Sequence, residues 1–74
     1  MDDKQFLYEN IFKLQGCFVI FQPHEDYSAC IIKTLYDRKE YSACGKDIYE
    51  AFRKAFENMP KGDSYEDGFE QRRN

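Results

Sequence analysis

The clearest pattern of apolar positions predicts a helix over residues 48–59. Apolar side chains recur there at i, i+3, i+4, i+7, i+8 and i+11, namely Ile48, Ala51, Phe52, Ala55, Phe56 and Met59. This spacing places them along one side of a helix. Asp47 precedes the stripe and Glu50 follows three residues later, which resembles a capping box. Pro60 and Gly62 suit the C-terminal end. We therefore predict an amphipathic helix that packs against a core.

A second helix is predicted near the N-terminus, over residues 4–14. Apolar residues recur there at mostly helical spacing. Asp2 and Asp3 stand where acidic side chains favour a helix N-terminus. Gly16 suits the end of the helix. The apolar stripe is broad, because Tyr8 and Phe12 flank it.

The residues between the two helices predict three strands. The segments 17–22, 28–36 and 41–44 are rich in β-branched, aromatic and other apolar residues. Pro23 ends the first segment, and the charged residues 37–39 form a turn between the second and third. The predicted fold class is α+β: a helix, a three-stranded antiparallel meander and a helix, in the order α-β-β-β-α.

The predicted strands carry apolar residues on both of their sides. Successive side chains alternate between the two faces of a sheet, yet residues 18–21 are all apolar, and Ile31 is followed by Ile32. A sheet with one face in water shows a cleaner alternation. Either both faces are covered, one by each helix or by a partner chain, or the uncovered face is an apolar binding surface.

The 74 residues allow one domain, which we assign to residues 1–62. Residues 63–74 form an acidic, aromatic tail with four acids and two arginines, either flexible or with a short helix over residues 65–73. The whole chain has a formal net charge of −3. A field of this sign repels nucleic acid unless basic side chains cluster locally.

Aromatic residues are more frequent than so short a chain needs for its core. The sequence has seven Phe and six Tyr among 74 residues, and a chain of this size buries only about 60–65% of its unfolded surface. Some rings should therefore lie at the surface, where they anchor interfaces. The predicted contact rings are Tyr8, Phe12, Tyr36, Tyr41, Tyr65 and Phe69. The predicted contact acids are Asp63, Glu66, Asp67 and Glu70.

The residues that could carry chemistry do not form a recognisable site. His24, the only histidine, precedes two acids and could shuttle a proton or bind a metal, but we interpret it as a polar residue in a strand connector. A zinc site of His24 with Cys17, Cys30 and Cys44 would lack the close Cys spacing of such sites. We therefore predict no catalytic residues, cofactor or metal, and a protein that is not an enzyme.

The three cysteines also bear on the compartment. They make an odd number with no close pair, so we expect free thiols, buried as small hydrophobic side chains, in a reducing cytoplasm. Asp2 and Asp3 stand where a signal peptide would be positively charged. No apolar run approaches the length of a membrane span.

The order of helix, three strands and helix resembles that of double-stranded-RNA-binding domains, over about residues 4–59. The resemblance implies that lysines at the start of the closing helix grip phosphates and that a histidine in a strand connector reaches the minor groove. Here Lys46 stands alone beside Asp47 and Glu50, and two acids follow His24. These departures weigh against RNA binding.

In its composition the chain is similar to small bacteriophage-encoded accessory proteins, including anti-CRISPR proteins, which are short, acidic, rich in aromatic residues and without catalytic motifs. This likeness implies a cytoplasmic inhibitor that binds another protein. We predict a small acidic module that blocks a basic site on a partner protein by steric cover and electrostatic attraction. The alternatives are a nucleic-acid module of the double-stranded-RNA-binding type and a self-associating regulatory subunit, such as a homodimer.

Overall fold

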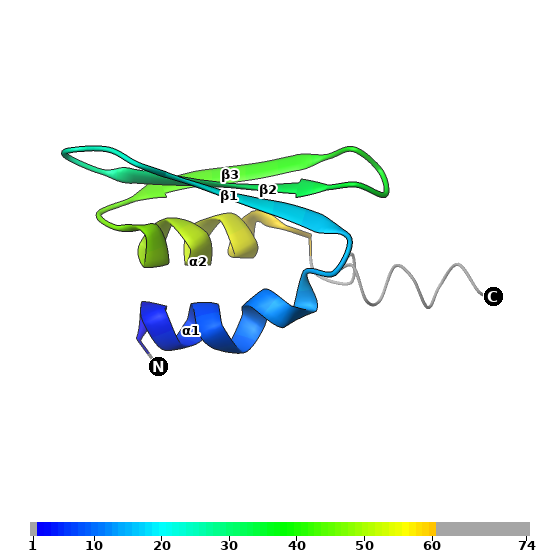
Figure 1. The fold of residues 1–74 in the computed structure, drawn as a ribbon, viewed down its shortest axis with the longest axis horizontal. Helices are drawn as coiled ribbons and strands as arrows, with labels where there is room; N and C mark the ends of the chain where they lie inside the picture. Colours follow the sequence, from blue (N-terminus) through cyan, green and yellow to red (C-terminus); the bar gives the residue numbers. More distant parts are fainter. Residues whose placement is uncertain (1, 61–74) are drawn as a thin grey trace.

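The computed structural model describes residues 2–60 and confirms the predicted α+β order (Figure 1). The elements are α1 (Asp3–Asn10), the 3-10 helix η1 (Ile11–Lys13), β1 (Cys17–Pro23), β2 (Ser28–Thr34), β3 (Glu40–Gly45) and α2 (Ile48–Asn58). The acidic tail, with its predicted short helix, lies outside the described residues.

Side-chain caps fix where the helices begin. The Asp2 carboxylate accepts the main-chain N–H of Gln5 at 2.7 Å, and the Asp47 carboxylate accepts that of Glu50 at 2.8 Å. The Glu50 carboxylate in turn accepts the N–H of Lys46 at 2.7 Å. Both predicted helix starts are therefore held by acidic groups, which satisfy N–H groups that have no partner within the helix.

The first helix is shorter than its apolar pattern predicts. It ends at Asn10, whose side-chain amide donates a hydrogen bond to the Phe6 carbonyl at 2.8 Å. The chain then tightens into η1, and Gly16 follows with a φ of 78°. Positive φ angles favour glycine, which has no Cβ to clash. The prediction of one continuous helix over residues 4–14 is therefore wrong in its last turn.

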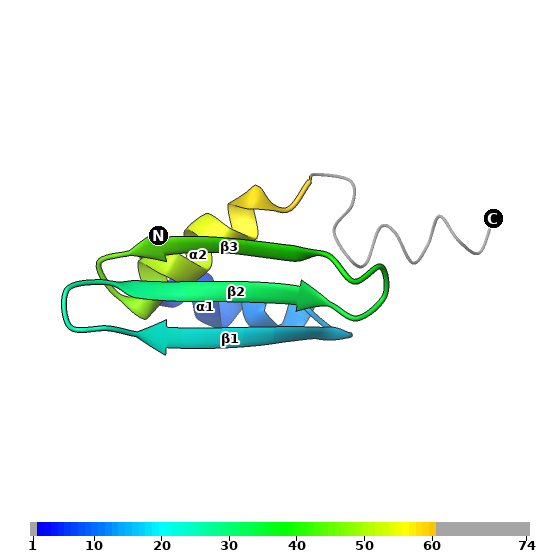
Figure 2. The same ribbon diagram turned by 90° about the horizontal axis from the view of Figure 1, so that it is seen from above.

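The three strands form one antiparallel sheet in the order β1-β2-β3 (Figure 2). Ile32 at the centre of β2 lies opposite Val19 of β1 and Tyr41 of β3. At one end, the His24 N–H donates to the Tyr27 carbonyl at 2.8 Å across the β1–β2 turn. At the other end, the turn between β2 and β3 contains the charged residues predicted there, but it begins at Leu35 because β2 ends at Thr34, two residues earlier than the predicted strand.

Both helices lie on the same side of the sheet. Helix α2 packs directly beneath the strands, and α1 packs against α2 on the side away from the sheet (Figure 1). The core between them consists of Leu14, Cys30, Ile32, Ala51, Phe52 and Ala55. Of the two arrangements expected from the strands, one helix on each face is therefore excluded. Within residues 2–60, the second face of the sheet is left uncovered.

The aromatic stripe of α2 joins the two helices. Phe52 is fully buried. The Phe6 ring of α1 meets the rings of Phe52 and Phe56 edge-on, with centroids 6.2 and 5.4 Å apart. Between the middle of α2 and the start of α1, the Arg53 Nε lies 2.6 Å from an Asp3 carboxylate oxygen, a contact that raises the pKa of Arg53. The ring contacts rather than this partly exposed ion pair carry the stability of the layer.

Candidate functional site

The uncovered side of the sheet presents nine side-chain positions, which we call the open face. The strand register arranges them in three rows across β1, β2 and β3: Phe18, Lys33 and Glu40; Ile20, Ile31 and Ser42; Gln22, Ala29 and Cys44. Because side chains alternate along a strand, these positions point away from the helices. No element in the described part of the chain packs on them.

Apolar side chains occupy one diagonal half of the open face. Phe18 is 55% exposed and Ile20 is 39% exposed. Ile20 pairs directly with Ile31 on the neighbouring strand. Leu35 extends the apolar area, because its N–H donates to the Gly16 carbonyl at 3.0 Å and so continues the ladder beyond Phe18. The Leu35 side chain is exposed too. Exposed apolar groups this close together are typical of interaction surfaces.

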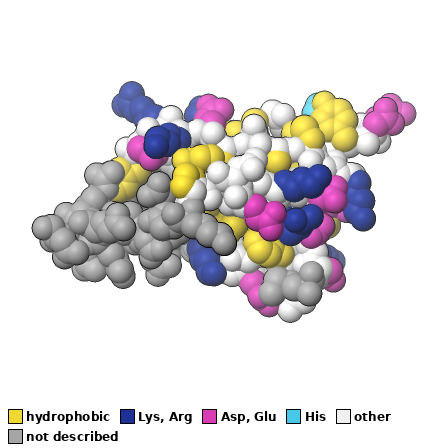
Figure 3. Space-filling model, turned by 180° about the vertical axis from the view of Figure 1, so that it is seen from behind, with side chains coloured by type: hydrophobic (Ala, Val, Ile, Leu, Met, Phe, Trp, Pro, Cys, Tyr) yellow, Lys and Arg dark blue, Asp and Glu magenta, His cyan; other side chains and the backbone are white. Residues whose placement is uncertain are grey.

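Polar groups border this apolar area. The Lys33 ammonium lies 3.4 Å from a Glu40 carboxylate oxygen in the first row, and Ser42 and Gln22 occupy positions in the other rows. An apolar centre with a polar rim is the usual composition of a protein–protein interface. On the side of the molecule in Figure 3, basic and acidic side chains are intermixed and separate several apolar patches from one another.

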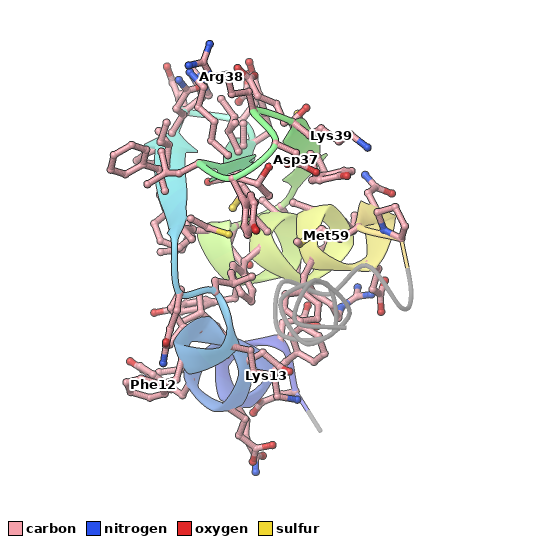
Figure 4. All side chains as sticks on the ribbon, turned by 90° about the vertical axis from the view of Figure 1, so that its right-hand side faces the viewer. Phe12, Lys13, Asp37, Arg38, Lys39 and Met59 are labelled. Carbon is pink, nitrogen blue, oxygen red and sulfur yellow. The ribbon has the colours of Figure 1, made fainter. Side chains whose placement is uncertain are left out.

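The predicted contact rings do not gather on this face. Tyr8 of α1 and Phe12 of η1 are exposed on the helical layer, and Tyr36 is exposed in the β2–β3 turn. Phe12 is 78% exposed and points outward on the side of the molecule where β1 lies (Figure 4). Tyr41 is half-buried and lies opposite the core residue Ile32, so it faces the helices. The other six predicted contact residues lie outside residues 2–60.

The residues of the open face were not among the predicted contacts. The composition of their segments predicts that Phe18, Ile20 and Ile31 lie in strands, but it does not predict that their side chains face outward. The signal that could have found them is the presence of apolar residues on both sides of these strands. Tyr27, exposed in the β1–β2 turn, was also missed. Its ring stacks on His24 with centroids 4.5 Å apart.

The cysteines differ in burial and in acidity. Cys30 is fully buried, and burial raises the pKa of its thiol to about 11. Cys17 is half-buried, and burial, together with the negative charge of Asp37, raises its pKa too. Cys44 is exposed on the open face, so the expectation that it is a buried hydrophobic side chain is wrong. Among residues 2–60, no three His, Cys, Asp or Glu side chains come together as a metal site.

Thiol labelling should follow this order. We expect N-ethylmaleimide to modify Cys44 first in the native protein and Cys30 last, because the reacting species is an accessible thiolate. Peptide mass spectrometry over a time course would measure the three rates. In denaturant the rates should converge, since burial no longer separates them. Native labelling of Cys30 as fast as that of Cys44 would contradict the fold.

Comparison of the chain with family models, curated proteins and solved structures gave no significant match. Neither described helix is long and apolar enough to cross a lipid bilayer. The interpretation of the site therefore rests on its own geometry.

Proposed function

We propose that this chain is a small binding module that docks onto another protein through its open face. The observation that carries the proposal is the apolar area of Phe18, Ile20 and Ile31, which no other part of residues 2–60 covers. Covering such an area stabilises the complex, because each Å² of apolar surface removed from water contributes about 25 cal/mol of favourable free energy. The polar positions around it would then fix the orientation of the partner.

The charge of the chain favours a partner with a basic surface. The net charge is −3, and the β1–β2 turn at one end of the sheet contains Glu25 and Asp26. In the turn at the other end, Asp37 lies beside Arg38 and 3.9 Å from the Lys39 ammonium. A hydrogen bond from the Thr34 hydroxyl lowers the pKa of Asp37, so this carboxylate stays charged in mild acid. Opposite charges on the two surfaces speed association and orient the encounter.

Binding of this kind acts by steric block and needs no chemical step. A module that covers a basic functional site, such as a nucleic-acid channel, would inhibit its partner while bound. An inhibitor of the phage anti-defence type, working in the cytoplasm, would fit this mode of action. The acidic tail would add charge to the same attraction.

Binding of duplex RNA is the second candidate, because the order of elements agrees with that of double-stranded-RNA-binding domains. The start of α2, where that family places lysines, weakens this candidate. Lys46 is followed by Asp47, which caps the helix, and Glu50 bonds the Lys46 N–H. Two carboxylates at this position would repel the phosphates that the lysines of the family attract.

Replacing Ile31 with lysine tests the proposal. We expect Ile31→Lys to abolish capture of the partner from a lysate of the native host, because a charge at the centre of the open face opposes desolvation. Gln15→Lys is the matched control, since it adds the same charge at an exposed loop position outside the sheet. Mass spectrometry would compare what each variant retains.

The outcomes separate the two candidates. Proteins lost with Ile31→Lys but retained with Gln15→Lys, and released by salt, support docking of a basic partner. Equal capture by both variants would overturn it. Retention of duplex RNA that disappears on nuclease treatment would favour the second candidate instead.

A further inference from the structure

The two edges of the sheet are protected to different degrees. On β3, the Ser42 carbonyl accepts a hydrogen bond from the Asn58 side chain of α2 at 3.1 Å, and Glu40 adds a charge. On β1, the seven residues Cys17–Pro23 include no charged side chain. Its pairing to β2 is continuous, without a bulge. Charges and bulges are the usual means by which proteins prevent an edge strand from pairing further.

The hydrogen bonds at the two ends of β1 show which main-chain groups point outward. The Leu35 N–H bonds the Gly16 carbonyl, and the His24 N–H bonds the Tyr27 carbonyl. Hydrogen-bonded pairs recur at every second residue of an antiparallel ladder. The main-chain groups of residues 18, 20 and 22 therefore face β2, and those of residues 17, 19 and 21 face outward.

Only two outward N–H groups of β1 need a partner. The Cys17 N–H already donates to the Leu14 carbonyl at 3.2 Å, and Pro23 has no N–H. Within the described residues, the N–H groups of Val19 and Phe21 have no acceptor. Their carbonyls also point outward, so this edge offers alternating donors and acceptors to another extended strand.

We propose that β1 pairs with β1 of a second copy of this chain, antiparallel, about a two-fold axis at Ile20. Residue 20 is the midpoint of Cys17–Pro23, so this register pairs the whole strand. Val19 lies opposite Phe21 of the second copy, and each free N–H meets a carbonyl. Cys17 and Pro23 lie opposite each other, where neither has a free N–H to satisfy. The two sheets join into one continuous sheet.

A second copy suits this edge better than a charged partner does. The chain carries a net charge of −3, but the paired strands themselves bring no charged side chain against another. The two Ile20 side chains meet on the same face, and such apolar cross-strand pairs stabilise a sheet. Phe12, exposed on the side where β1 lies (Figure 4), is available to the helical layer of the second copy.

Pairing of the edges leaves the open face accessible and nearly doubles it. The dimer therefore does not depend on the partner protein proposed above, and either proposal can fail without the other. Ile31→Lys, which disables the centre of the open face, leaves the outward main-chain groups of β1 intact.

Analytical ultracentrifugation of the full chain tests the dimer. We expect the wild-type protein to sediment as a dimer and Ile20→Lys to be monomeric, with a dissociation constant raised about 100-fold or more, because two like charges then meet at the axis. Ser42→Lys adds the same charge to the same face on β3 and should leave the dimer intact. A wild-type monomer at the highest concentration would overturn the proposal.

Hydrogen exchange provides a readout that does not depend on a variant. The amides of Val19 and Phe21 should exchange at least about tenfold more slowly at concentrations where the dimer forms than on dilution. Fast exchange of both amides in a dimer would show that the copies associate elsewhere. Dissociation by Ser42→Lys as complete as that by Ile20→Lys would point to packing of the open faces instead. Either result overturns pairing of the β1 edges.

Discussion

Replacing Phe52 with alanine is expected to remove a large part of the stability of this domain, about half at the middle of the expected ranges. Phe52 is fully buried, and its ring contacts those of Phe6, Phe21 and Phe56. Truncating a buried phenylalanine to alanine costs about 3–5 kcal/mol, from lost transfer free energy and the cavity left behind. A chain of 74 residues has a free energy of unfolding of roughly 4–11 kcal/mol. Urea denaturation followed by circular dichroism would measure the loss.

The matched control for this prediction is Phe12→Ala. It makes the same substitution at a ring that is 78% exposed on η1. Substitutions at exposed positions usually change stability by less than about 0.5 kcal/mol. Equal losses for the two variants would show that the aromatic core is not where the fold places it.

The sequence predicts both the presence of α2 and the side that it buries, because its apolar residues recur along one side of the helix only. Ala51, Phe52 and Ala55 recur on one side of the helix, so the side that packs against the sheet follows from the spacing alone. Asp47 and Glu50 then mark the start through their side-chain chemistry. Local sequence is sufficient in such an element, because one set of residues decides both the element and its packing.

The covered face of the strands is harder to predict from the sequence, because apolar residues on both sides do not show which face the helices cover. Phe18 and Ile20 on one side of β1 are as apolar as Val19 and Phe21 on the other. The choice depends on where two helices dock, and a single strand does not contain that information. The sequence therefore predicts an uncovered apolar face as one of two alternatives, but it does not show which strand residues form that face.

The pairing of β3 with β2 decides which side chains of β3 face the helices. Tyr41 lies opposite the buried Ile32, so Cys44, three residues further along the strand, must face away from the helices. The sequence suggested an exposed Tyr41 and a buried Cys44. Because the side-chain period of a strand is two residues, one register determines both positions together. That register describes how β3 pairs with β2 across the turn over residues 35–39, so it does not follow from the sequence of β3 alone.

The open face and the free edge of β1 make different demands on a partner. In the proposed binding to a partner protein, the open face would require a surface that excludes water from Phe18, Ile20 and Ile31, and its rim charges would influence the choice of partner. The edge requires only an extended backbone in register, and Val19 and Phe21 provide the donors. A dimer formed at the edge would present two open faces on one continuous sheet. Two-site attachment would then strengthen binding to a partner that repeats its basic site.

Gly45 is a position whose importance the sequence pattern did not show. It ends β3 directly before the turn into α2. A Cβ atom there would lie 2.8 Å from the main-chain nitrogen of Ala51 and 2.8 Å from the Glu50 Cβ. The contact with the Ala51 nitrogen is to helix backbone, which cannot rotate away as a flexible side chain would. Gly45 is not among the described residues with positive φ, so the constraint is space rather than conformation.

Gly45→Ala should therefore destabilise the domain by about 1–3 kcal/mol, the range for overpacking of a tight contact. The strand and the helix must separate to admit the methyl group, which loosens the caps at Asp47 and Glu50. Thermal denaturation would show a lower melting temperature. Relative to the wild-type protein, the hydrogen-exchange rate should increase more in the first turn of α2 than at Ile32 in the sheet centre. Cys44→Ala, at the exposed neighbouring position, should change stability by less than about 0.5 kcal/mol. A Gly45→Ala variant as stable as Cys44→Ala would mean that α2 does not approach β3 as closely as the fold requires.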